Sequence, residues 1–303
     1  MSKPRLATVI LGGCTGCHLS LLDAHEGLLD LFDQVELVHS PFTAGSDVPT
    51  CEIALVEGAI QNEHDVEVAK AVREKAATVI AMGSCATLGG IGGLRNLESK
   101  RRLVREVYGE SGPAGAVEDA EEVGMDVPTL EEAVRPLSAV IDVDLEIPGC
   151  SPPTKYILDA LDALLRGESP DLPRHNLCYE CSRRHEKMLQ PSRDFVADAV
   201  YSVMELDEID PDVCFLEQGV ICMGPISREG CGARCVSANV PCRGCMGSSR
   251  KDFEQGAKMV DVLGAVLPSG AIMYLDDLVG TGYRYTTAVS VFPSRMGKED
   301  EDE

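Results

Sequence analysis

Residues 6–17 read LATVILGGCTGC, an apolar β-type run that leads directly into glycines and the pair Cys14 and Cys17. Further short runs of this kind lie at 35–38, 53–56, 78–82 and 140–147. Between them, apolar residues recur with helical spacing at 19–29, 66–76 and 157–165. Strands that alternate with helices predict an α/β fold, with a parallel sheet covered on both faces.

The sequence changes character at about residue 169. Before that point, Pro152–Pro153 and Gly167 should bound the last helix, and the Gly- and acid-rich stretch 106–132 is expected to be an insertion or loop. Beyond it, Gly and Pro are frequent, and one helix is expected near 252–263. We therefore predict a sheet domain over 1–168, an irregular domain over 169–296 and an acidic disordered tail over 297–303. Metal binding would supply the folding energy that the irregular part lacks.

The composition argues against some classes of function and for metal binding. A net charge of -23 argues against binding to nucleic acids or anionic membranes, whose phosphates would be repelled. No export signal and no apolar run of membrane-spanning length is visible, so a cytoplasmic location is expected. Thirteen cysteines in such a chain indicate metal binding more than disulfides, which are the alternative.

Cysteines follow three of the predicted strands. Cys14 and Cys17 come after the first strand, Cys85 after the fourth and Cys150 after the fifth. Ligands of an open parallel sheet bind at the carboxyl ends of its strands. Four thiols that are far apart in the sequence should therefore converge on one edge, where glycines let the backbone approach a bulky ligand.

Four thiolates suit either zinc or an iron–sulfur cluster. Zinc sites are usually built locally from two short cysteine pairs, whereas a site assembled from three strand ends is wider and suits a cubane cluster better. The pair Cys14 and Cys17 could also be a redox dithiol, but that interpretation leaves Cys85 and Cys150 unexplained.

The second half carries eight cysteines, enough for two further four-thiolate sites. Divided by their order, one site takes Cys178, Cys181, Cys214 and Cys222, and the other takes Cys231, Cys235, Cys242 and Cys245. Cys51 is then left over. It is expected to be a small buried hydrophobic residue, the alternative being a place near the edge of the first cluster.

Two polar residues need an interpretation as well. His175 precedes Cys178 by three residues, so it could be a ligand, but a surface or supporting role is favoured because Cys181 is available. Glu57 follows the third strand and points at the edge that carries the cysteines. It could accept hydrogen bonds behind the cluster, relay protons, or simply be a solvated strand-end acid. The remaining histidines are interpreted as ordinary helix, loop or surface residues.

Four motifs stand in order along the chain: the Cys14 pair, Val-Glu-Gly-Ala-Ile at 56–60, Gly-Ser-Cys-Ala-Thr-Leu-Gly-Gly at 83–90 and Ile-Pro-Gly-Cys-Ser-Pro-Pro at 147–153. Together they resemble the small subunit of [NiFe] hydrogenases. The resemblance implies a flavodoxin-like N-terminal domain with a proximal [4Fe–4S] cluster on Cys14, Cys17, Cys85 and Cys150. It also implies a distal cluster on Cys178, Cys181, Cys214 and Cys222, and a medial one on Cys231, Cys242 and Cys245.

Two departures from the family pattern are informative. Periplasmic members use a histidine as the first distal ligand and three cysteines for a medial [3Fe–4S] cluster. Here Cys178 replaces the histidine and Cys235 offers a fourth medial thiolate, so three [4Fe–4S] clusters are expected. Within the family, the chain is most similar to the gamma subunit of the methanogen hydrogenase that does not reduce the deazaflavin coenzyme and feeds heterodisulfide reductase.

The resemblance implies an electron-transfer role. H2 would be split at a nickel–iron centre on a separate large subunit, and electrons would pass from the proximal through the medial to the distal cluster. They would leave to an iron–sulfur acceptor, for which heterodisulfide reductase is the candidate. Two alternatives stay open: a multi-zinc structural protein, and a complex I-type iron–sulfur subunit, although that family carries an adjacent Cys-Cys pair that is absent here.

Overall fold

The computed structural model describes residues 2–43, 47–108, 128–171, 173–183, 200–201, 203–206, 208–249, 254–266, 275 and 277–291. The chain divides into two compact units. One unit comprises Met1–Asp162 and the chain from Tyr285 onward, and the other comprises Ala163–Arg284. Segment 285–291, which the sequence places in the second domain, thus belongs to the first unit. The predicted acidic tail lies outside the described residues.

A five-stranded parallel sheet forms the centre of the first unit, in the order β2-β1-β3-β5-β7. The strands are β1 (Arg5–Ile10), β2 (Glu36–His39), β3 (Cys51–Glu57), β5 (Ala76–Met82) and β7 (Leu145–Ile147). The central strands β3 and β5 are almost entirely buried, because helices cover both faces of a parallel sheet. This order is that of flavodoxin-like folds, so the predicted fold class is confirmed.

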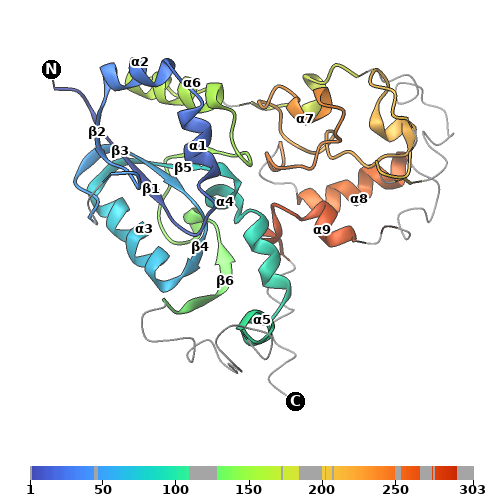
Figure 1. Ribbon diagram of the computed structural model, residues 1–303, viewed down its shortest axis with the longest axis horizontal. Helices are drawn as coiled ribbons and strands as arrows, with labels where there is room; N and C mark the ends of the chain where they lie inside the picture. The colour runs from blue at the N-terminus through green and yellow to red at the C-terminus, as the bar shows by residue number, and fades with distance from the viewer. Residues whose placement is uncertain are drawn as a thin grey trace. The chain divides into compact units, whose positions relative to one another are not determined.

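Helices lie on both sides of the sheet. Figure 1 shows α1 (Gly16–Leu22), α2 (Gly27–Gln34) and α6 (Thr154–Leu165) on one side and α3 (Glu63–Lys75) on the other. The shorter helices are α4 (Gly83–Leu88) and α5 (Lys100–Tyr108). A capping box begins α3, in which Asn62 accepts the N–H of Asp65 and the Asp65 carboxylate accepts the N–H of Asn62. As predicted, α6 follows Pro152–Pro153 and ends before Gly167, whose φ is +73°.

Three elements differ from the prediction. The strand expected over 140–147 begins only at Leu145. Just before it, the Asp144 carboxylate accepts the N–H of Val79 at 2.7 Å. The helical pattern at 19–29 divides into α1 and α2. The predicted loop 106–132 contains the end of α5 and the start of β6 (Leu130–Arg135), which pairs antiparallel with β4 (Ile60–Asn62). Residues 109–127 lie outside the described part.

The second unit is irregular, as predicted. Its helices are α7 (Arg234–Ser237), α8 (Gln255–Val266) and α9 (Leu278–Gly282), with 3-10 helices η4 (Leu177–Tyr179) and η5 (Phe215–Gln218). The core gathers Phe215, Leu216, Met223, Met259 and Leu263, together with the thiols of Cys214 and Cys242. Two predicted ligands are therefore part of the core itself. In the described part of the chain, no helix is long and apolar enough to cross a bilayer.

Candidate iron–sulfur cluster sites

The four predicted proximal cysteines lie at the carboxyl end of the sheet. Cys14 is in the loop after β1, Cys17 in the first turn of α1, Cys85 in α4 directly after β5, and Cys150 directly after β7. The three other thiols each exert an electrostatic effect on the Cys17 thiol. The structure therefore brings these four residues together, as the topology of the sheet predicts.

Two glycines keep space open around these thiols. Gly83 has a φ of +90°, and a Cβ atom there would collide with the Sγ atom of Cys17. Gly90 has a φ of +61°, and its Cβ atom would lie 2.6 Å from the Sγ atom of Cys85. Both positions need glycine for their backbone conformation and for the room that it leaves at a thiol.

Burial makes the thiols of Cys17, Cys85 and Cys150 reluctant to ionise. It raises the pKa of Cys17 well above its ordinary value, with Glu57 and the neighbouring thiols adding to the effect. It also raises the pKa of Cys85 and of Cys150 to about 11. Thiolates are the form that binds metal, and a bound cationic centre is what stabilises several of them together. Four thiols gathered at one rim are a donor set of the kind that iron–sulfur clusters use.

A single tetrahedral zinc ion is the alternative to a cluster at this rim. Each Zn–S bond is about 2.3 Å, so the sulfurs of a tetrahedral site lie within about 4 Å of one another. Among the described residues, no group of three or more His, Cys, Asp or Glu side chains could hold a metal ion in this way.

Behind the proximal cysteines lies a buried pair, His18 and Glu57. The Glu57 carboxylate lies 2.6 Å from Nδ1 of His18 and accepts the His18 backbone N–H at 2.9 Å. The two residues are 2% and 1% exposed, so Glu57 is not a solvated strand-end acid. Phe42 packs edge-on against the His18 ring. The sequence did not indicate this role for His18, because its partner lies on a strand far along the chain.

The four predicted distal cysteines line one cavity. Cys178, Cys181, Cys214 and Cys222 surround it together with Phe215 and other apolar residues. Burial raises the pKa of Cys178 to about 12, and its three partner thiols add to that rise. Residues from separate segments of the irregular unit thus present four thiols to one space, as their order in the sequence predicts.

Arg183 also lines the distal cavity and was missed by the sequence reasoning. It is only 4% exposed, and its guanidinium carbon lies 3.7 Å from the centre of the Phe215 ring. One guanidinium nitrogen donates to the carbonyl oxygens of Asp210 and Val213, at 2.8 and 2.7 Å. A buried arginine that ties together the loop before Cys214 has no signature in the sequence, since arginines are usually exposed.

The structure brings three of the four predicted medial cysteines near one another. Electrostatic effects link Cys245 to both Cys231 and Cys242, and burial raises the pKa of Cys231 to about 11. Cys235 is exposed on the short helix α7. Within the described residues, no interaction joins its thiol to the other three, so its role as fourth ligand stays a prediction.

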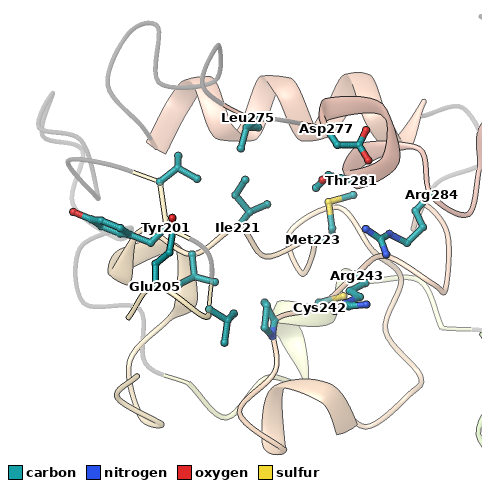
Figure 2. A pocket seen from close by; sticks show the side chains of 14 residues that line it. Tyr201, Glu205, Ile221, Met223, Cys242, Arg243, Leu275, Asp277, Thr281 and Arg284 are labelled. Carbon is teal, nitrogen blue, oxygen red and sulfur yellow. The ribbon is translucent and has the colours of Figure 1, made fainter. Parts of the chain in front are cut away.

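Cys242 opens onto a cavity of about 490 Å³ in the second unit. Figure 2 shows Arg243 and Arg284 at one end of this cavity, near Cys242 and Met223, and Tyr201 and Glu205 at the other end. Asp277 on the rim is occupied as the N-cap of α9, where its carboxylate accepts the N–H of Gly280 at 2.6 Å.

Two other residues take the roles favoured from the sequence. His175 is exposed, pairs with Glu229 at 2.9 Å and stacks on Tyr179, so its ring already has partners outside the distal cavity. Cys51 is 3% exposed and begins β3. The proximal thiols lie beyond the other end of that strand, about 20 Å away for a strand of this length, so Cys51 is not at the cluster edge.

Comparison with known proteins agrees with this geometry. A family model described as NADH ubiquinone oxidoreductase, 20 Kd subunit, matches residues 14–164. In the solved structure of the NAD+-reducing [NiFe]-hydrogenase in the H2-reduced state, one chain is similar to this protein, with 37% sequence identity and a TM-score of 0.53. The match covers 56% of this chain and 96% of that chain. A [NiFeSe] hydrogenase chain from Desulfovibrio vulgaris Hildenborough shares the fold at 19% identity and a TM-score of 0.52, covering 84% of this chain and 96% of its own.

A relative covers both units. This relative, which is one of the subunits of the F420-non-reducing hydrogenase of Methanothermobacter marburgensis, is 39% identical over 98% of this chain and 98% of its own length. The match to the 20 Kd subunit model, in contrast, stops before the cysteines of the second unit. The chain therefore belongs to the family of electron-transfer small subunits of [NiFe] hydrogenases that includes this methanogen relative.

Proposed function

We propose that this chain carries electrons from H2 oxidation on a partner large subunit, through three [4Fe–4S] clusters, to an iron–sulfur acceptor in the cytoplasm. The observation that supports the cluster sites most directly is the distal cavity, where Cys178, Cys181, Cys214 and Cys222 line one space. Bound clusters would supply the one-electron redox chemistry that amino-acid side chains lack.

The chain's own residues hold and shield these sites. Twelve of the thirteen cysteines are the proposed ligands, in the three groups predicted from the sequence. Gly83 and Gly90 keep room at the proximal thiols, and Phe215 and Leu177 exclude water from the distal ones. Shielding of this kind matters because burial and hydrogen bonds to sulfur set the potential of a cluster.

The proposed electron acceptor rests on the relationship to the methanogen hydrogenase. The name of the methanogen relative says that its hydrogenase does not reduce F420, so a different acceptor is needed. An iron–sulfur protein such as heterodisulfide reductase would receive electrons from the distal site. The net charge of -23 favours docking to a basic face of that partner.

Iron and sulfide analysis of the anaerobically purified complex, combined with EPR of the reduced sample, tests this function. We expect a brown protein with about twelve irons bound by this chain, four for each cluster. A colourless preparation that contains zinc in place of iron would reject the cluster proposal and favour the multi-zinc alternative.

A further inference from the structure

Glu180 lies between the distal cysteines in the sequence, but its carboxylate reaches the medial segment. Its Oε1 atom accepts the backbone N–H of Gly230 at 3.1 Å and that of Ala233 at 3.3 Å. The same oxygen lies 3.6 Å from the Sγ atom of Cys231. A side chain of the distal segment is therefore in direct contact with a predicted medial ligand.

Backbone hydrogen bonds fix the approach of Glu180 to this loop. The N–H of Leu177 donates to the carbonyl oxygen of Ser227 at 2.8 Å, and the N–H of Glu229 donates to that of His175 at 3.1 Å. The segment before Glu180 and the segment before Cys231 thus run side by side. This pairing places the backbone of Glu180 beside the Cys231 loop, within reach of the N–H groups that its carboxylate accepts.

The loop that carries Cys231 is shaped to receive an anion. Gly230, Gly232 and Ala233 all have positive φ values, of +106°, +66° and +49°. Successive turns of this kind point backbone N–H groups into a concavity that binds anions, including iron–sulfur clusters. Two of these N–H groups are taken by the Glu180 carboxylate, and charge-assisted bonds of this kind are the stronger ones.

We infer that Glu180 is a positioning residue that fixes the Cys231 loop and holds a negative charge beside the medial cluster, thereby lowering its reduction potential. The inference rests on the proposed function, because it needs a cluster at the medial site. Its physical reason is simple: a fixed negative charge opposes the addition of an electron nearby.

The test is a redox titration of the anaerobically purified complex, followed by EPR, with Glu180→Gln. Glutamine keeps an oxygen for the two N–H donors but carries no charge. Glu168→Gln is the matched control, because Glu168 is an exposed acid of the same unit that pairs with Arg166. The medial signal is assigned by its loss in Cys245→Ser.

We expect Glu180→Gln to retain its iron and to shift the reduction equilibrium of the medial cluster about tenfold toward the reduced form, which is about 59 mV for a one-electron couple. Glu168→Gln should leave it unchanged. Full iron with an unshifted medial potential in Glu180→Gln would overturn the inference, while the clusters themselves would still support the proposed function.

If Glu180→Gln fails to retain the medial cluster, Glu180→Asp tests the role of the charge instead. Aspartate keeps the charge on a shorter side chain. A medial potential close to that of the wild type supports the role of the charge. A tenfold shift toward reduction with the charge still present contradicts it.

Discussion

The backbone N–H of Cys242 donates a hydrogen bond to the Sγ atom of Cys222, with an N–S distance of 3.4 Å. Cys242 belongs to the predicted medial set and Cys222 to the predicted distal set. Next to this bond, the N–H of Met223 donates to the carbonyl oxygen of Cys242 at 2.9 Å. Hydrogen bonds to ligand sulfur tune cluster potentials. A change in the Cys242 segment should therefore alter the potentials of both the medial and the distal cluster.

Cys85→Ser should remove the proximal cluster and stop H2-dependent dye reduction, because a hydroxyl replaces one of four thiolates. Iron analysis should show a loss of about four irons per chain. Cys51→Ala is the matched control, since Cys51 lies in the same unit at the far end of β3. Dye reduction that persists after the proximal cluster is lost would contradict the proposed electron path.

Gly83→Ala should damage the same site without removing a ligand. The new methyl group would collide with the Sγ atom of Cys17, and the φ of +90° is strained for any residue with a Cβ atom. We expect less proximal iron and a weaker proximal EPR signal. Gly167→Ala separates the two causes, because Gly167 also has a positive φ but nothing lies within 4 Å of its Cβ position. Equal iron loss in both variants would point to backbone strain alone.

Glu57→Leu should destabilise the first unit. It leaves the backbone N–H and the ring nitrogen of His18 buried without their acceptor, at a cost of about 3 kcal/mol. Thermal unfolding of the anaerobic complex measures the effect as a lower midpoint. The exposed residue Glu74 on α3 provides the control, and Glu74→Leu should leave the midpoint nearly unchanged. A stable Glu57→Leu variant would mean that the pair is not important for folding.

Cys235→Ser tests the fourth medial ligand. If Cys235 binds the medial cluster, its loss should leave a three-iron cluster, seen as about one iron fewer per chain and as a new EPR signal in the oxidised protein. Cys231→Ser should be more damaging, because the Cys231 thiol lies in the loop that Glu180 holds. Unchanged iron and spectra in Cys235→Ser would show that the medial site uses three cysteines only.

Removal of iron should affect the two units differently. Cys214 and Cys242 are part of the hydrophobic core of the second unit, which has few long elements of its own. The first unit keeps a five-stranded sheet in any case. After chelation we expect faster hydrogen exchange across the second unit, whereas β3 and β5 stay protected. Equal loss of protection in both units would contradict this difference.

The sheet and its site were predictable because their signals are local. Apolar runs such as 53–56 are almost wholly buried in the structure, and a cysteine directly after a strand has only one edge to occupy. The weaker predictions were those without a local pattern. β6 pairs with β4 across a long separation, and no periodicity in the acid-rich stretch before it indicated a strand.

The sequence by itself determined the parallel sheet, the rim on which Cys14, Cys85 and Cys150 meet, and the grouping of the distal cysteines. These follow from strand direction and from order along the chain. Only the tertiary structure decided that His18 pairs with Glu57, that Arg183 is buried beside the distal thiols and that Glu180 reaches Cys231. Each of those contacts joins residues from different segments, and packing selects such partners without leaving a pattern in the sequence.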